Sequence, residues 1–273
     1  MDRIRTFRAL HASGCFILPN AWDLGSARLL IGLGFPALAT TSSGLAWSRG
    51  RPDNHVGRDT TLAFLQELCG AVSVPVTADF EGGFAVAPEE VAANVAAASL
   101  TGVAGLSIED STGDRSAPLF EFELALERLQ AARRAIDERG GIVLTARSEG
   151  FIVGRPDLRE TIRRLTAFAE AGADCLYAPG LRAIADIRAV VEAVAPKPVN
   201  VLVGSGFTTA AELAGVGVRR ISVGGALARA AWSGVLRAAT EMAEHGTFTA
   251  LSSAMSNAEL NESFPTGHPD TSS

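Results

Sequence analysis

The sequence predicts an α/β protein, a (β/α)₈ TIM barrel with a C-terminal helical extension. Short β-rich runs alternate with longer helical patterns along the whole chain, and eight such units can be counted. The length of 273 residues is close to the roughly 250 residues of a single barrel. A hydrophobic content of 47% is enough for one large core. We therefore expect one catalytic barrel domain over residues 1–246 and an extension over residues 247–273.

The units follow in order along the chain. Prolines with acidic neighbours at 88–90 and 156–157 favour first turns of helices, and Gly102, Gly140 and Gly172 stand where helices end. The strands are predicted at residues 16–19, 37–41, 74–78, 105–109, 142–146, 174–178, 198–203 and 220–223. The helices are predicted at residues 24–33, 59–70, 88–101, 121–139, 157–171, 182–194, 208–215 and 225–244.

An open doubly wound sheet is the alternative architecture. A dinucleotide-binding version is disfavoured because Gly204-Ser-Gly206 lacks the third glycine of the fingerprint. From about residue 247 the composition shifts to Ser, Thr, Asn and Pro. One short helix is expected over residues 250–260, and the last dozen residues are predicted to be disordered.

Composition and charge restrict the partners. A net charge of -6 with scattered basic residues leaves no electrostatic footprint for nucleic acid. No apolar run reaches the roughly 18 residues of a membrane span, and the N-terminus has no signal-peptide pattern. Cys15, Cys69 and Cys175 are odd in number and lie in apolar contexts, which predicts reduced thiols. We expect a cytoplasmic protein with a small-molecule substrate and no nucleic-acid or membrane partner.

Two carboxylates stand two residues apart where an apolar strand meets a glycine turn, at Asp79 and Glu81. In a strand such residues point to one face, and a like-charged pair there favours a divalent cation. Oxygen ligands select Mg²⁺, with Mn²⁺ possible, over zinc. A second reading stays open, in which one carboxylate faces solvent and the other caps the next helix.

Other polar residues end neighbouring predicted strands, and in a barrel these ends form the active-site mouth. Glu109, Arg147 and Glu149 follow this pattern, and Asn200 lies within the seventh strand. A purely structural network with Arg147 between Glu109 and Asp79 is an open alternative. Asp23 is expected to cap the first helix, and His55 to lie on a surface loop.

Negative evidence limits the chemistry. Lys197 is the one lysine in the chain, and it precedes the seventh strand at the bottom of the barrel. A Schiff-base aldolase needs a lysine at the mouth, so that mechanism is excluded for a barrel. The Gly-x-Ser-x-Gly elbow of serine hydrolases is also missing.

With these residues in hand, the chain resembles the isocitrate lyase and phosphoenolpyruvate mutase superfamily. The motifs that carry the resemblance run through nearly the whole barrel. They are Pro19-Asn-Ala-Trp-Asp23, Thr41-Ser-Ser-Gly-Leu45, Gly50-Arg-Pro-Asp53, Thr77-Ala-Asp-Phe-Glu-Gly-Gly83, Ile108-Glu-Asp110 and Ala146-Arg-Ser-Glu149.

The resemblance implies a set of roles in an enzyme that passes through an enolate of a small 2-oxo or 2-hydroxy acid. It implies metal binding by Asp79, Glu81 and Glu109, catalysis by Asp53, Glu109 and Arg147, and substrate binding by Trp22, Thr41, Ser42, Ser43, Arg147 and Asn200. It also implies a homodimer or homotetramer, because many members exchange a C-terminal helix between subunits.

One departure from the superfamily directs the functional hypothesis. Isocitrate-type lyases carry a Lys-Lys-Cys-Gly-His loop after strand 4, whereas residues 111–118 here contain no cysteine, lysine or histidine. We therefore expect a Mg²⁺-dependent carbon-carbon lyase, a decarboxylase or retro-aldol enzyme, with little need to protonate the leaving group. Phosphorus-carbon chemistry, with Thr112 or Arg115 on the phosphoryl group, and a non-catalytic oxo-acid-binding barrel are the alternatives.

Overall fold

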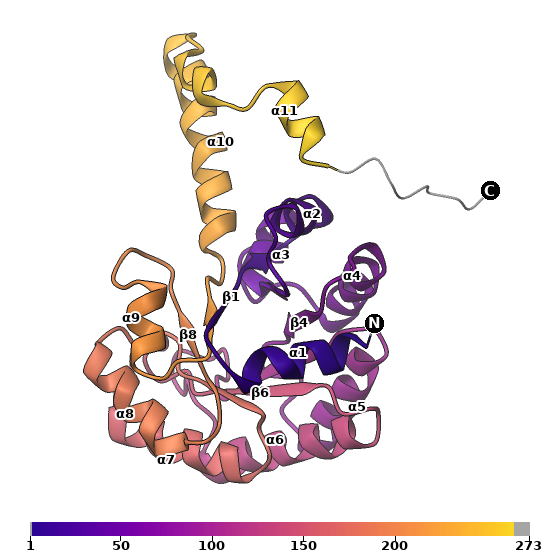
Figure 1. The fold of residues 1–273 in the computed structure, drawn as a ribbon, viewed down its shortest axis with the longest axis vertical. Helices are drawn as coiled ribbons and strands as arrows, with labels where there is room; N and C mark the ends of the chain where they lie inside the picture. Colours follow the sequence, from indigo (N-terminus) through magenta and orange to yellow (C-terminus); the bar gives the residue numbers. More distant parts are fainter. Residues whose placement is uncertain (1, 265–273) are drawn as a thin grey trace, which may run out of the picture.

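The computed structural model describes residues 2–264, which fold into a barrel of parallel strands surrounded by helices (Figure 1). The predicted fold class is confirmed. One sheet runs in the order β1-β9-β8-β7-β6-β5-β4-β3-β2. Its strands are β1 (Phe16–Leu18), β2 (Asn20–Ala21), β3 (Leu38–Thr40), β4 (Val76–Asp79), β5 (Gly105–Glu109), β6 (Val143–Arg147), β7 (Cys175–Tyr177), β8 (Val199–Leu202) and β9 (Arg220–Ser222).

The first predicted strand is divided at Pro19 and thereby joins both edges of the sheet. Residues before Pro19 form β1, which pairs with β9, and the two residues after it, beyond the predicted strand, form β2, which pairs with β3. Proline cannot donate to a ladder, but its carbonyl accepts a 2.9 Å hydrogen bond from the N–H of Ala39. This bend explains why the sheet has nine strands where eight units were predicted.

Helices follow the strands as predicted, with ends within two residues of the expected ones. Asp23 forms a capping box with Ser26, so the predicted cap of the first of these helices is confirmed. They are α2 (Leu24–Gly32), α4 (Arg58–Ala71), α5 (Pro88–Ser99), α6 (Phe122–Asp137), α7 (Leu158–Glu170), α8 (Ile184–Val194), α9 (Ala210–Gly215) and α10 (Ala226–His245).

Other elements differ from the sequence prediction. Helix α1 (Arg3–Ala12) was not predicted; Asp2 caps it, and Phe7 anchors it in the core. Helix α3 (Ser42–Ser48) occupies a segment predicted as loop, because the Thr41 side chain caps it. The helix predicted over residues 250–260 is wrong: a 3₁₀ turn (Thr249–Ser253) and α11 (Asn257–Glu262) stand there instead. The disorder prediction falls largely on residues 265–273, outside the described residues.

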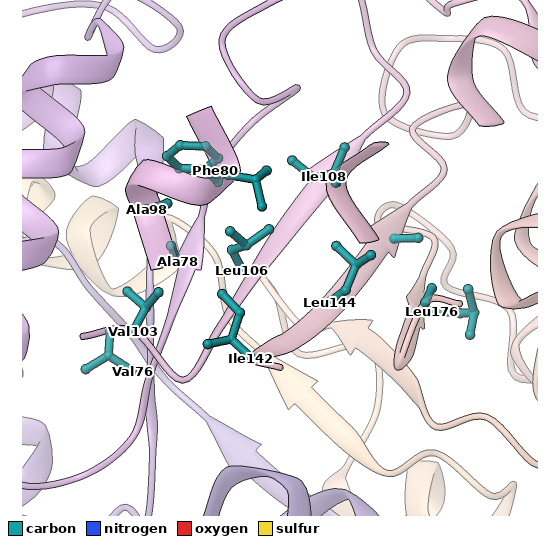
Figure 2. Close-up of a cluster of buried hydrophobic side chains, with 14 of the residues drawn as sticks. Val76, Ala78, Phe80, Ala98, Val103, Leu106, Ile108, Ile142, Leu144 and Leu176 are labelled. Carbon is teal, nitrogen blue, oxygen red and sulfur yellow. The ribbon is translucent and has the colours of Figure 1, made fainter. Parts of the chain in front are cut away.

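The main apolar core lies between the sheet and the helices, while a smaller apolar cluster around Phe7 and Val143 fills the N-terminal end of the barrel interior. Leu106, Ile108 and Leu144 point outward from β5 and β6 into this core (Figure 2). Because side chains alternate along a strand, the odd-numbered residues of β4, β5 and β6 face inward. These include Asp79, Glu109 and Arg147, the last residues of their strands. The alternation thus brings three charged side chains to one end of the barrel.

Helix α10 extends away from the barrel, the 3₁₀ turn η1 (Thr249–Ser253) packs on it, and α11 lies apart from it, above α2 in this view (Figure 1). Of its 20 residues, Ala228 is the one buried hydrophobic residue. Trp232, Val235 and Leu236 are all exposed. Neither α10 nor any other helix within residues 2–264 is long and apolar enough to cross a membrane.

Helix α1 covers the N-terminal end of the barrel and buries His11 there. The imidazole packs edge-on against Phe7 and Phe16, with ring centroids 4.7 and 5.2 Å away. Its Nδ1 lies 2.8 Å from the carbonyl oxygen of Phe7, and Nε2 lies 3.3 Å from Nη1 of Arg220. Burial, and then the charge of Arg220, lower the pKa of His11 from 6.5 to about 4.

This depressed pKa predicts acid sensitivity of the fold. Unfolded chains take up a proton at His11 near pH 6.5, whereas the folded protein resists protonation down to about pH 4. As the pH falls from about 6.5 to about 4, the free energy of unfolding should therefore decrease, and His11 should account for about 3 kcal/mol of this decrease. Chemical denaturation at several pH values should show a shallower fall for His11→Gln. The control His245→Gln, on an exposed side chain, should keep the wild-type slope; an equal slope in all three proteins would contradict the assignment.

Candidate active site

Arg147 lies at the centre of a charged network at the C-terminal end of the barrel. Its Nη1 lies 2.7 Å from Oδ1 of Asp79, its Nη2 lies 3.2 Å from Oε2 of Glu109, and its Nε lies 2.8 Å from Oε1 of Glu149. Strand register places Glu109 directly beside Arg147 and Arg147 beside Tyr177. The predicted bridge between Asp79 and Glu109 is therefore present, with Glu149 as a third partner.

Asp79 links this network to the start of α3. Its Oδ2 accepts hydrogen bonds of 3.0 Å from both the N–H and the hydroxyl of Ser42. The main-chain N–H of Asp79 in turn donates to the Thr40 hydroxyl at 2.9 Å. The carboxylate is thus oriented from two sides, which preorganises it for binding.

Glu81 lies in a turn, so the strand geometry assumed for the Asp79 and Glu81 pair is wrong. Strand β4 ends at Asp79, and Glu81 has a left-handed φ of 49°. Phe84, three residues later, also has a positive φ, of 56°. Non-glycine residues in this conformation cost free energy and persist only where their surroundings fix them. Burial, and after it the nearby charge of Asp79, raise the pKa of Glu81, so the two carboxylates still influence each other.

Side chains from two helices hold this turn by its carbonyl groups, and a third helix supports one of these side chains. The Arg128 guanidinium on α6 donates to the carbonyls of Gly82, Ala85 and Glu109. Asn94 on α5 donates to the carbonyl of Gly83 at 2.8 Å and accepts from Arg58 on α4 at 2.9 Å. These contacts fix the backbone that carries Glu81.

Two cavities open at Arg147. The larger has a volume of about 510 Å³ and is lined by residues that include Glu81, Glu109, Arg115, Arg147 and Glu149. The smaller, of about 180 Å³, reaches into the barrel interior and shares Ser42, Asp53 and Arg147 with the first. Both volumes are sufficient for a small carboxylic acid.

Negative charge exceeds positive charge around Arg147. Burial, and then Asp79 and Glu109, raise the pKa of Glu81 from 4.5 to about 8. Burial also raises the pKa values of Glu109 and Glu149, while Arg147 opposes this rise. A raised pKa favours the protonated form of a carboxyl group unless a cation compensates its charge.

The donor set fits a hard divalent cation. Asp79, Glu81 and Glu109 offer only oxygen atoms, and Mg²⁺ takes one or two carboxylates while keeping several waters. Within residues 2–264, no three His, Cys, Asp or Glu side chains form a ready-made metal cluster. The residues therefore suit a partly hydrated Mg²⁺ better than a fully protein-ligated ion.

The structure brings most of the predicted substrate-binding residues to the cavities. Thr41, Ser42 and Ser43 line the smaller cavity, and the Thr41 hydroxyl lies 3.0 Å from that of Ser43. Asn200 lines it too, but deep in the barrel, where its amide bonds Ser222 and Arg220. Trp22 was expected at the substrate and lines neither cavity, because the chain turns at Asp23 into α2.

The loop before α4 carries Asp53 and His55, which lie at different places relative to the two cavities. Asp53 lines both cavities, and its pKa is raised by burial, with a smaller contribution from Asp79. His55 is exposed, and its Nδ1 lies 2.8 Å from the main-chain oxygen of Asp53. The expected surface position of His55 is confirmed, and it lines neither cavity.

Two buried arginines behind the network were missed in the sequence. Arg128 and Arg164 stand on the apolar stripes of α6 and α7, at the i, i+3, i+4 spacing of buried residues. Arg164 pairs with Asp110 at 3.2 Å, and Asp110 accepts from the N–H of Glu149 at 2.8 Å. A charged residue at an apolar-stripe position was the available signal. Both arginines support strand ends that carry the acidic residues.

The fold and site define a class of protein: a (β/α)₈ barrel whose strand ends present carboxylates and one arginine to a small, acidic cavity. Comparison with known sequences agrees. The phosphoenolpyruvate phosphomutase family profile matches residues 7–243. The chain belongs to this family, within the phosphoenolpyruvate mutase and isocitrate lyase superfamily.

Several relatives extend over most of the chain. A Burkholderia cenocepacia protein of unassigned lyase or mutase activity is 47% identical, with a TM-score of 0.93 over 98% of this chain and 96% of its own. An uncharacterized Mycobacterium tuberculosis protein is 34% identical over 80% of this chain and 81% of its own.

Relatives with named activities are more distant. The oxaloacetate decarboxylase of Paraburkholderia xenovorans is 30% identical over 71% of this chain and 66% of its own. A phosphonopyruvate hydrolase in complex with oxalate and Mg²⁺ is 25% identical, with a TM-score of 0.84 over 96% of this chain and 95% of its own. Lyases, hydrolases and mutases thus share this fold.

The carbonyl contacts of Arg128 predict a large effect on stability. Arg128→Met leaves buried carbonyls on the Glu81 turn without donors, which should lower the free energy of unfolding by about 3 kcal/mol. Arg134→Met, on an exposed position of the same helix, should change it by less than about 0.5 kcal/mol. Urea denaturation measures both. Equal, small effects would show that Arg128 does not hold the turn.

Proposed function

We propose that this protein is a Mg²⁺-dependent carbon-carbon lyase that acts on a small 2-oxo or 2-hydroxy carboxylic acid through an enolate. Decarboxylation of a 2-oxo diacid such as oxaloacetate is the preferred reaction. The observation that carries the proposal is Arg147, fixed by three carboxylates at the edge of a cavity of about 510 Å³. Such a fixed donor can stabilise negative charge that develops on a bound oxo acid.

Arg147 retains donors for a substrate. A guanidinium has five N–H groups, and three of its nitrogens each hold one carboxylate here. One N–H on each terminal nitrogen stays available, and Arg147 lines both cavities. In the proposed reaction these groups donate to the carbonyl oxygen of the substrate, where negative charge appears when the carbon-carbon bond breaks.

Ser42 and Ser43 are proposed to bind the substrate carboxylate. They open α3, where the Ser42 N–H already donates to Asp79 and the Ser43 N–H has no partner within the helix, so Ser43 supplies the main-chain donor. Their place on the wall of the smaller cavity supports this role.

Mg²⁺ held by Asp79, Glu81 and Glu109 supplies further stabilisation of the enolate charge when it is bound. These residues also set the charge balance, since bound cation charge lets Glu81 and Glu109 stay ionised.

Glu149 is the proposed proton donor. It lines the larger cavity, and burial raises its pKa, so that its carboxyl group can hold a proton near neutral pH. Loss of CO₂ leaves the bonding pair on the enolate, and transfer of the Glu149 proton to its carbon gives the 2-oxo acid anion, which is pyruvate when the substrate is oxaloacetate, and leaves Glu149 as a carboxylate. His55, the other candidate acid, lies outside both cavities.

Phosphorus-carbon cleavage is the second candidate, and it is favoured by one residue. Arg115 lines the larger cavity, where it could meet a phosphoryl group. Thr112 gives less support, because its hydroxyl donates to the main-chain oxygen of Ala117 at 2.6 Å.

A panel of oxo and hydroxy diacids together with phosphonopyruvate tests the reaction. We expect Mg²⁺-dependent release of pyruvate from oxaloacetate, and Glu149→Gln should lower kcat about a hundredfold with little change in KM. Glu127→Gln, on an exposed position of α6, is the matched control. Phosphate release from phosphonopyruvate, seen in phosphorus-31 spectra, would favour the second candidate. Absence of deuterium exchange at the pyruvate methyl group would favour a non-catalytic barrel.

Oxalate, a planar mimic of the enolate, tests the metal site separately from turnover. Calorimetry should detect oxalate binding only with Mg²⁺ present, and Asp79→Asn should weaken it about a hundredfold. Asp137→Asn, on an exposed side chain at the end of α6, should bind as the wild type does. Oxalate binding without a divalent cation would contradict the metal assignment.

We further propose that the protein is a homodimer or homotetramer in which a second copy covers α10. Trp232, Val235 and Leu236 form an exposed apolar strip on this helix, and such a strip is unfavourable in water. Residues of the strip also line a groove with Trp47 and Pro52 of the barrel.

A single charge placed on the exposed apolar strip of α10 should weaken the assembly. Leu236→Asp should shift the protein to monomers in sedimentation velocity, because a buried carboxylate without a partner disfavours association. Glu244→Lys, near the end of the same helix, should leave the assembly unchanged. A monomeric wild-type protein at micromolar concentration would refute the assembly.

A further inference from the structure

A second arginine, Arg220, lies inside the barrel and takes no part in the proposed reaction. It is the first residue of β9, at the opposite end of the barrel from Asp79, the last residue of β4. Its side chain points inward with Ser222, while Ile221 between them joins the outer core. Arg220 is 4% exposed, so its charge is almost completely removed from water.

The hydrogen bonds of Arg220 within residues 2–264 go to neutral groups. Its Nε donates to Oδ1 of Asn200 at 2.9 Å, and its Nη2 donates to the Thr145 hydroxyl at 3.1 Å. Its third contact is Nη1 to Nε2 of His11, at 3.3 Å. The Phe7 carbonyl can only accept, so Nδ1 of His11 carries the proton and Nε2 is the acceptor. Two of the five N–H groups are left for another acceptor.

Among residues 2–264, the positive charges of other buried arginines are stabilised by carboxylates or by main-chain carbonyls, and that of Arg220 is not. Arg147 and Arg164 form ion pairs with carboxylates. Arg128 donates to three main-chain carbonyls. Asp174, which precedes β7 at the N-terminal end of the barrel, already forms ion pairs with Arg8 and Arg133, each at 3.0 Å. A buried guanidinium without a counter-charge is unfavourable, which points to an anion that the protein binds.

The interior cavity of about 180 Å³ gives such an anion a place beside Arg220. Its wall carries hydroxyl and amide groups, from Thr77, Ser107, Asn200 and Ser222, together with apolar side chains such as Leu18 and Leu202. The acids on its wall, Asp53 and Asp79, belong to the mouth, where Asp79 is held by Arg147 and Ser42. A volume of this size holds a small anion with a few waters.

We propose that this interior cavity is a binding site for a small anion, with Arg220 as its cation and neighbouring hydroxyl groups as further donors. The ligand is a chloride ion or a single carboxylate group, free or part of a bound acid. The proposal goes beyond the lyase function, because it stands on the burial of Arg220 and holds equally for a barrel without catalysis.

Thermal unfolding in chloride tests the site. Potassium gluconate, whose anion is too bulky for the cavity, is replaced by potassium chloride or acetate at constant ionic strength. Wild-type Tm should rise by about 4 °C when the small anion exceeds its Kd tenfold. Arg219→Gln removes the same charge from the neighbouring, outward arginine, which bonds the carbonyl of Gly14, and should respond as the wild type does. Arg220→Gln should lose the response.

A bromide soak of wild-type crystals decides the question even where Arg220→Gln does not fold. An anomalous peak in hydrogen-bonding range of the Arg220 guanidinium supports the site. An empty cavity together with an anion-independent wild-type Tm overturns it. Chloride that weakens oxalate binding would identify the anion as a carboxylate of the bound acid. Chloride without effect on oxalate would identify a separate ion site.

Discussion

The contact between Arg147 and three carboxylates is the interaction on which the rest of the site depends. Asp79, Glu109 and Arg147 end neighbouring strands, and Glu149 follows two residues later. An arginine at this place lets acidic groups approach one another at the mouth, because each shares the same cation. Their charge still exceeds that of Arg147, as the raised pKa of Glu81 indicates. The site is therefore assembled, yet incompletely neutralised, which is the condition for binding a further cation.

The surrounding helices fix this network from outside the sheet. Arg128 on α6 holds the carbonyls of the Glu81 turn, and Arg164 on α7 holds Asp110, which bonds the N–H of Glu149. Both guanidinium groups cross the apolar layer between helices and sheet to reach polar backbone at the strand ends. Strained backbone at Glu81 is tolerated because its carbonyls are fully engaged. The rigid outer layer thus positions the groups that face the cavity.

Much of the fold and of the candidate site could be predicted from the sequence, and the predictions that were wrong have physical causes. Alternation of apolar and polar residues in β4, β5 and β6 predicted which side chains meet at the mouth, and Asp79, Glu109 and Arg147 do meet. The i, i+2 argument was wrong for Glu81, because the strand ends at Asp79 and a left-handed turn follows. Helix α3 was missed because a cap by Thr41 and a run of small residues resemble a loop. Trp22 lines neither cavity, because a strand end and a helix start are adjacent there.

The sequence by itself determined the barrel, the order of its units and the family motifs, since these follow from local periodicity and from residue types at strand ends. It also excluded reactions whose essential residue the chain does not provide, such as Schiff-base aldol chemistry, which needs a lysine at the mouth. Tertiary structure alone decided how the charges are shared. Arg147 binds three carboxylates, Arg128 binds main-chain carbonyls, and the partners of Arg220 among residues 2–264 are neutral. Charge compensation depends on distances between residues far apart in the chain, and on their burial, neither of which a linear pattern contains.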